Sequence, residues 1–166
     1  MIGLLQRVAK ASIEVGGEEI ARIGPGLLVL VGIERGDDEA IAERLLERLL
    51  TYRVFADADG RMNLSVTDSG GSLLLVPQFT LAADTARGLR PGFSHAAAPA
   101  DAGRLFVHMA KRAEIRSPGT QAGRFGAHMR VSLVNDGPVT FLLRQGEAGS
   151  SRNPGGSVDQ TGPSSA

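Results

Sequence analysis

Two short segments carry the residues best suited to chemistry. The first, Gln78-Phe79-Thr80, follows an apolar run and combines an amide, an aromatic ring and a hydroxyl. Consecutive backbone N–H groups at the end of a strand can form an oxyanion hole. Thr80 is a candidate nucleophile, but a threonine hydroxyl needs an adjacent base, and none stands beside it in the sequence. The alternative interpretation is structural, with Phe79 packed in the core at a strand end.

The second segment, Asn135-Asp136-Gly137-Pro138, interrupts two apolar stretches at residues 129–134 and 139–143. Its four residue types are typical of turns, which predicts a hairpin between two strands. The alternative is that Gly137-Pro138 is functional. An X-Pro bond can be cis, and a cis bond here would point neighbouring carbonyl oxygens in one direction. Two parallel carbonyl oxygens on a stiff turn could bind an ammonium group.

A third candidate is Gly92-Phe93-Ser94-His95, which approximates a nucleophile elbow but lacks its last glycine and the strand that should precede it. An esterase that uses Ser94 as its nucleophile is therefore one hypothesis for the function. The chain has no cysteine, and its three histidines lack the spacing of metal ligands. We expect no metal and no cofactor.

The charges balance over the whole chain but are segregated along it. Lys and Arg together number 18, as do Asp and Glu, which argues against binding nucleic acid by bulk charge. Residues 34–59 are mainly acidic, whereas residues 104–130 are mainly basic. A basic face could contact a few phosphates, so a non-catalytic RNA-binding module is a further hypothesis. The structural alternative is a solvated helix face.

The hydrophobic pattern predicts the elements that must position these residues. Strands are expected at 2–15, 19–23, 27–33 and 73–76, and helices at 37–53 and 99–114. Asp37 is the expected cap of the first helix, and Asp59-Gly60 predicts a hairpin. The fold class is α+β: one domain, residues 1–144, with a largely antiparallel, barrel-like sheet and two main helices. Residues 145–166, rich in Gly, Ser and Pro, are predicted to be a disordered tail.

No apolar stretch approaches the length of a membrane span, and the first residues do not resemble a signal peptide. The expected location is therefore the cytoplasm.

Taken together, these residues resemble the D-aminoacyl-tRNA deacylase family. The resemblance runs through about residues 1–144 in the family's order. The segments that carry it are Arg7-Val8 with Ala11-Ser12, Arg61-Met62-Asn63-Leu64-Ser65-Val66, Gln78-Phe79-Thr80-Leu81, residues 120–125, and Asn135-Asp136-Gly137-Pro138-Val139-Thr140-Phe141. The resemblance implies a homodimeric enzyme that acts on aminoacyl-tRNA. It would hydrolyse the ester between a D-amino acid and the 3′ ribose, remove glycine from mischarged tRNA, and spare L-aminoacyl-tRNA.

The resemblance also implies roles for particular residues. Gly137-Pro138 would be a cis pair inserted into the partner subunit's pocket as a chiral filter, and Arg7 would hold that turn. Gln78-Phe79-Thr80 would form the catalytic wall beside the ester. Phe125 and Met129 would lie near the terminal adenosine. Catalysis would be assisted by the RNA itself, which agrees with a sequence that shows no catalytic triad.

One position departs from the family pattern. The family usually has Ser before the Gln, and this chain has Pro77. Proline removes both a hydroxyl and a backbone N–H from this position. The N–H groups of Phe79 and Thr80 stay available as donors.

Overall fold

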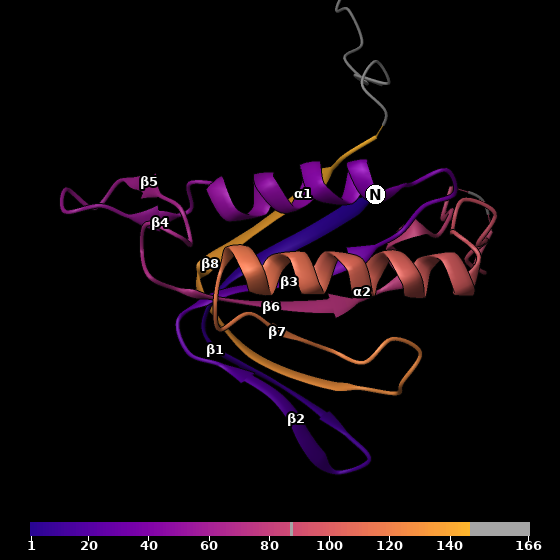
Figure 1. Ribbon diagram of the computed structural model, residues 1–166, viewed down its shortest axis with the longest axis horizontal. Coiled ribbons are helices and arrows are strands. Elements are labelled where there is room, and N and C mark those ends of the chain that lie inside the picture. The colour runs from indigo at the N-terminus through magenta and orange to yellow at the C-terminus, as the bar shows by residue number, and fades with distance from the viewer. Residues whose placement is uncertain (87, 147–166) are drawn as a thin grey trace, which may run out of the picture.

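A computed structural model describes residues 1–86 and 88–146 (Figure 1). Its main feature is a six-stranded mixed sheet in the order β2-β1-β3-β6-β7, with β8 paired to β1. The strands are β1 (Ile2–Val15), β2 (Glu18–Ile23), β3 (Gly26–Gly32), β6 (Ser72–Pro77), β7 (Gln121–Ala122) and β8 (Arg130–Arg144). A small hairpin, β4 (Phe55–Ala56) with β5 (Met62–Leu64), projects from the body at the left of Figure 1. Most of the predicted tail lies outside the described residues.

The strand β1 organises the sheet, because it pairs with three other strands. One edge of β1 is antiparallel to β8 along nearly its whole length, from Ile2 to Glu14. The other edge pairs with β3 over residues 2–8 and with β2 over residues 11–15. The pairs β3–β6 and β6–β7 are parallel. The sheet curls into a nearly closed barrel, and the predicted fold class is confirmed.

Two helices, α1 (Glu39–Thr51) and α2 (Pro99–Arg116), lie side by side over one face of the sheet (Figure 1). Their leucines pack with alternate residues of β3, including Leu27, Val29 and Val31, in one hydrophobic core. Leu28 points the other way, into a second cluster inside the barrel. The strand is thus buried on both faces, as its continuous apolar run predicts. No helix among the described residues has the length and apolar character needed to cross a membrane.

The cap of α1 differs from the prediction. Asp38, not Asp37, is the N-cap, and its Oδ1 accepts a 2.7 Å hydrogen bond from the Ile41 backbone N–H. Asp37 instead accepts hydrogen bonds from the Met1 ammonium group at 2.7 Å and from the Glu34 N–H at 2.7 Å. Burial raises the pKa of Asp37, although these two bonds oppose the increase.

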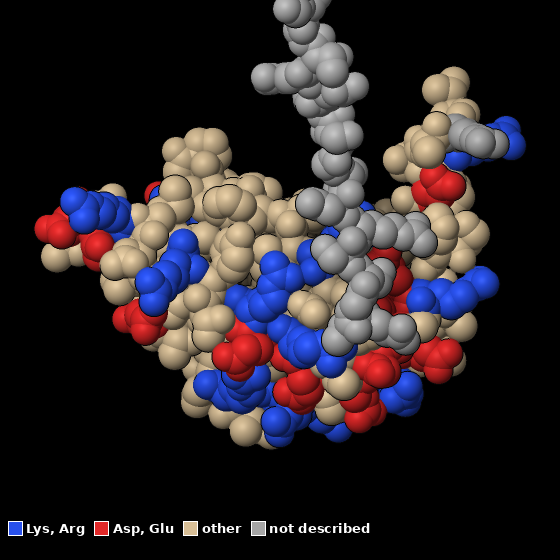
Figure 2. All heavy atoms as spheres, turned by 90° about the horizontal axis from the view of Figure 1, so that it is seen from above, with Lys and Arg blue, Asp and Glu red and all other residues tan. Residues whose placement is uncertain are grey.

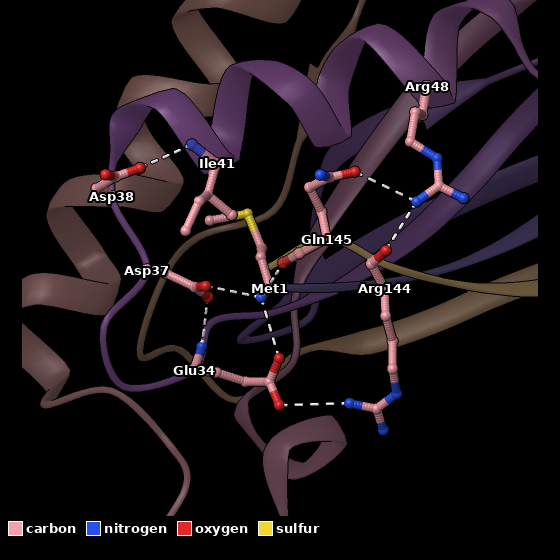
Figure 3. A network of polar contacts seen from close by, with 8 residues as sticks. All are labelled: Met1, Glu34, Asp37, Asp38, Ile41, Arg48, Arg144 and Gln145. Atoms are coloured by element: carbon pink, nitrogen blue, oxygen red, sulfur yellow. Dashed lines mark hydrogen bonds and ion pairs between the residues drawn. The ribbon is translucent and has the colours of Figure 1, made fainter. Parts of the chain in front are cut away.

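The Met1 ammonium group lies at the centre of a network that ties three parts of the chain together (Figure 3). Besides Asp37 it contacts Glu34 Oε2 at 3.0 Å and the Gln145 carbonyl oxygen at 2.8 Å. Arg144 pairs with Glu34 at 3.3 Å, and Arg48 of α1 donates to the Arg144 carbonyl at 2.7 Å. The network joins the start of β1, the end of β8 and the entrance of α1.

The two helices are also joined by a row of ion pairs. Basic residues of α2 meet acidic residues of α1 in the pairs Arg104–Glu39, Arg112–Glu43 and Arg116–Glu47. His108 Nε2 adds a 3.2 Å contact with Glu43. Figure 2 shows blue and red side chains interspersed over the face that carries α1. Much of the basic run predicted from the sequence is therefore neutralised by the acidic run.

Glu43 gives this row a testable pH dependence. Burial alone would raise the pKa of Glu43, but Arg112 and then His108 outweigh burial and hold that pKa below its usual value. The ionised Glu43 carboxylate therefore stabilises the folded protein at any pH above the usual glutamate pKa. This stabilisation is lost as the pH falls through the lowered pKa of Glu43 in the folded protein. We expect Glu43→Gln to lower the free energy of unfolding by up to about 1 kcal/mol at neutral pH.

Urea unfolding at pH 7 and at pH 3 measures this effect. The difference in the free energy of unfolding between wild type and Glu43→Gln should be smaller at pH 3 than at pH 7. Glu114→Gln is the control, since Glu114 is exposed on α2 and makes no ion pair with the described residues. A gap that stays constant with pH would contradict the assignment.

Candidate functional site

A largely apolar cavity of about 460 Å³ lies where β6 ends and α2 begins. Four of the predicted site residues line it: Gln78, Phe79, Phe125 and Met129. They come from segments nearly 50 positions apart in the chain, and the fold brings them together. The other lining residues are Val76, Pro77, Ala96, Ala97, Pro99, Ala102, Gly126, Ala127, His128 and Val131.

One wall of the cavity is the turn from β6 into the short 3₁₀ helix η1 (Phe79–Ala82). The Gln78 N–H donates to the Val31 carbonyl at 2.8 Å, and the chain then leaves the sheet. The first N–H groups of a helix have no acceptor within it, so those of Phe79 and Thr80 are not used by η1. The turn lies tightly against β3, because a Cβ on Gly32 would come within 2.8 Å of the Leu81 Cβ.

Pro77 fits this geometry without disturbing the sheet. In a parallel pair, alternate residues direct their N–H groups to opposite neighbours. Gln78 bonds to β3, so the Pro77 nitrogen faces the β7 side, where pairing extends only over Leu74 and Leu75. The missing N–H of proline therefore breaks no ladder hydrogen bond, as expected for proline at a sheet margin.

The structure argues against two of the predicted alternatives: Thr80 as a nucleophile and Phe79 as a core residue. The Gln78 amide donates to the Thr80 hydroxyl, and no carboxylate or imidazole bonds to that hydroxyl within the described part of the chain. The geometry therefore supplies no base for a threonine nucleophile. Phe79 is 57% exposed and packs against Phe93, with ring centroids 5.1 Å apart, so the core interpretation of Phe79 is wrong.

The opposite wall depends on two glycines that the sequence analysis did not single out. A Cβ on Gly103 would lie 3.3 Å from the Phe125 ring, so the missing side chain lets that ring pack close to the backbone of α2. A Cβ on Gly123 would lie 2.8 Å from the Met129 sulfur and 3.3 Å from Pro77. A glycine inside a regular element often marks such a close approach, so the presence of glycine at these two positions was the signal in the sequence that could have pointed to them.

Gly123→Ala is expected to lower activity about tenfold, because the added methyl group drives Met129 into the cavity and a displaced wall misplaces the substrate. The flexible Met129 side chain can move, so the protein should still fold. Gly119→Ala is a control on the same connection, because a Cβ at Gly119 meets nothing within 4 Å, although its φ of +91° adds strain. The check is the rate of ester hydrolysis together with the melting temperature of each variant. A Gly123→Ala rate equal to that of wild type would rule out this packing role.

Gly137 and Pro138 lie in a wide bulge, and the predicted hairpin is wrong. The strand β8 pairs with β1 on both sides of the interruption, with Gln6 opposite Thr140 and Val8 opposite Asn135. Residues 136–139 are thus extruded opposite the single residue Arg7. The Gly137–Pro138 peptide bond is cis.

Side chains hold this bulge where backbone pairing is lost. Asn135 closes its base by accepting from the Val139 N–H at 2.7 Å and donating to the Thr140 hydroxyl at 3.0 Å. Arg7 donates from Nε to the Asp136 carbonyl at 2.9 Å and from Nη1 to the Val54 carbonyl at 2.5 Å. Arg7 therefore connects the bulge to the chain that follows α1.

The bulge and the cavity do not meet within one chain. Arg7, Gly137 and Pro138 are absent from the residues that line the cavity. Between Met129 and the bulge lies a paired part of β8, residues 130–135, which spans roughly 20 Å. The structure thus assembles Gln78, Phe79, Phe125 and Met129 at one place, and Arg7, Gly137 and Pro138 at another.

Ser94 lies in an exposed loop. Within the described residues, no hydrogen bond joins its hydroxyl to a histidine. No group of three or more His, Cys, Asp or Glu residues in the described ranges could hold a metal ion.

Comparison with solved structures defines the class of this fold. The chain is similar to the c-Myc DNA unwinding element binding protein, with a TM-score of 0.83 and 36% identity over 87% of this chain and 98% of that one. It shares its fold with a probable eukaryotic D-amino acid tRNA deacylase, with a TM-score of 0.71 and 17% identity over 86% and 97% of the two chains. The mixed barrel with two helices is thus a fold that such deacylases have.

The sequence itself gives the family. The sequence model of the D-Tyr-tRNA(Tyr) deacylase family matches residues 4–144, and the chain belongs to this family. The D-aminoacyl-tRNA deacylase of Azotobacter vinelandii is 64% identical over 143 residues, which cover 86% of this chain and 99% of that protein. The D-aminoacyl-tRNA deacylase of Nitrosococcus oceani is 62% identical over 144 residues, which cover 87% of this chain and 93% of that protein. The predicted family and enzyme class, a hydrolase of carboxylic esters, are confirmed.

Proposed function

We propose that this protein hydrolyses the ester of D-aminoacyl-tRNA and releases the free D-amino acid and tRNA. Its relatives from Azotobacter vinelandii and Nitrosococcus oceani carry the name of this activity. The observation that carries the proposal is the cavity, which unites Gln78 and Phe79 with Phe125 and Met129. We place the reaction in the cytoplasm, where aminoacyl-tRNA is used.

The cavity supports a reaction that needs few protein side chains. The N–H groups of Phe79 and Thr80 at the start of η1 are suited to stabilise the oxyanion that forms when the ester carbonyl is attacked. The ribose 2′-hydroxyl beside the ester can assist that attack from within the substrate. Phe125 and Met129 would hold the terminal adenosine on the opposite wall, with the adenine stacked on an aromatic ring. Pro77 removes no donor that this scheme requires.

Thr80→Ala separates this scheme from a threonine nucleophile. The change removes the hydroxyl but keeps the backbone N–H, so the rate should fall by no more than about tenfold. A nucleophile would instead lose nearly all activity. The measurement is single-turnover release of D-tyrosine from D-Tyr-tRNA. Thr85→Ala, on the loop after η1, is the matched control for the loss of a threonine hydroxyl.

The chiral filter is proposed to come from a second copy of the chain. Gly137 and Pro138 do not line the cavity of their own chain, whereas residues beside the bulge expose apolar surface at Val134, Phe141 and Leu142. The long strand β8 also pairs only with β1 among the described strands. A homodimer could cover this surface and insert the bulge of one subunit into the cavity of the other.

In that arrangement, chirality is read by exclusion. If the carbonyls of Gly137 and Pro138 bind the α-ammonium group, the substituents on Cα have fixed directions. A D side chain then points to solvent, and an L side chain collides with the carbonyls. Specificity of this kind comes from a built-in clash and needs no side-chain pocket. Glycine has no side chain to exclude, so glycyl-tRNA should also be hydrolysed.

The test uses purified protein with D-Tyr-tRNA and glycyl-tRNA. We expect both esters to be hydrolysed and light scattering to report a dimer. Binding of tRNA without turnover would instead favour a non-catalytic tRNA-binding module. Ser94→Ala addresses the other rival: its activity should equal that of wild type, and loss of activity would favour a Ser94-dependent esterase.

A further inference from the structure

A second groove, of about 470 Å³, lies between α2 and residues 120–125, which comprise β7 and the residues on either side of it. Lys111 and Glu114 line its α2 side, and Gln121 and Arg124 line the other side. Phe125 lines both this groove and the apolar cavity. The two spaces are therefore neighbours that share one aromatic ring.

The groove carries basic residues that are not neutralised. On the face of α2 turned to α1, Arg104, Arg112 and Arg116 are all paired with glutamates. Lys111 and Arg124 are exposed, and neither makes an ion pair with any residue that the structure describes. Glu114 is the one acidic residue that lines the groove. The arginines of α2 that face α1 are thus neutralised, whereas the groove as a whole has two basic residues, Lys111 and Arg124, against one acidic residue, Glu114.

A polynucleotide that ends in the cavity must leave it along some path. The nucleotide before the terminal adenosine is joined through the 5′ phosphate of that adenosine. Proteins that bind single-stranded RNA combine stacking on aromatic side chains with a positive groove that follows the backbone. Phe125 on one side and Lys111 with Arg124 on the other supply these two parts next to each other.

We propose that this groove binds the backbone of the single-stranded 3′ end of tRNA, with Lys111 and Arg124 contacting the phosphates that precede the terminal adenosine. Gln121 lines the same groove and offers an amide to a base edge. The inference rests on the proposed function, which places the adenosine against Phe125. It also divides the basic run of residues 104–130 into an interhelical part and an RNA-binding part.

The experiment compares two substrates, D-Tyr-tRNA and D-tyrosyl-adenosine, which contains the same ester but no phosphate. Lys111→Glu and Arg124→Glu should each raise the KM for D-Tyr-tRNA about tenfold and weaken its dependence on salt. The effect on D-tyrosyl-adenosine should be much smaller. Arg44→Glu on α1 is the matched control, because Arg44 is exposed and bears no ion pair among the described residues. Arg44→Glu should leave the KM for both substrates unchanged.

Two outcomes would overturn the proposal: an unchanged KM for D-Tyr-tRNA, or equal losses on both substrates, which would mean that the changes act through the cavity. Failure of the proposed function is distinguishable, because wild-type protein would then hydrolyse neither substrate. Fluorescence anisotropy with an oligonucleotide ending in CCA still tests the groove in that case. Charge reversal at Lys111 or Arg124 should weaken its binding, and unchanged binding would refute the groove.

Discussion

Replacing Gly137 by alanine is expected to lower hydrolysis of D-Tyr-tRNA by about a hundredfold or more. Gly137 has a φ of +141°, a region that L-residues with a side chain rarely adopt. An added Cβ would also lie 2.6 Å from the Val139 Cγ2 and 2.9 Å from the Val139 nitrogen. The nitrogen belongs to the backbone and cannot rotate away, so the whole bulge must shift.

A shifted bulge would point its carbonyl oxygens away from the positions proposed to bind the substrate. Single-turnover kinetics with excess enzyme measure the loss, and thermal unfolding shows whether the fold is intact. Gly60→Ala is the control, because Gly60 also has a positive φ of +76° but has nothing within 4 Å of an added Cβ. Wild-type rates for Gly137→Ala would remove the bulge from the mechanism.

Mixing two inactive variants is expected to restore about a quarter of the wild-type activity, if sites form across a twofold interface. One variant carries Gly137→Ala, which damages the bulge. The other carries Met129→Trp, which fills the cavity with a larger side chain. In a mixed dimer, one site combines both defects, and the other combines an intact cavity with the partner's intact bulge.

The restored activity distinguishes a shared site from a site within one chain. The two variants are unfolded together, refolded as a mixture and assayed beside each variant refolded alone. Random pairing makes about half of the dimers mixed, and one of the two sites in each mixed dimer is intact. Activity no higher than that of the separate variants would contradict insertion of the bulge into the partner's cavity.

The sequence predicted the strands and helices well where hydrophobic periodicity is continuous. It failed at two places where a distant contact decides between adjacent alternatives. Asp37 and Asp38 are equally suited to cap α1, but the Met1 ammonium group, 36 positions away, binds Asp37. Likewise, turn-forming residues at 135–138 do not reveal whether the chain reverses, because only the pairing of β8 with β1 on both sides shows that it continues.

The residues of the candidate site could be predicted from the sequence only in part. The grouping of Gln78 and Phe79 with Phe125 and Met129 was implied by family resemblance and could not be inferred from spacing. The roles of Gly103 and Gly123 depend on which side chains approach their backbones, and this is information that the fold supplies. Charge counting, in turn, detected the basic run but could not show which of its residues pair with α1.

The most direct test of the central claim compares the rates at which purified protein hydrolyses D-Tyr-tRNA and L-Tyr-tRNA under identical conditions. The account predicts that D-tyrosine is released while L-Tyr-tRNA stays intact beyond its spontaneous hydrolysis. Equal rates on the two substrates would contradict it.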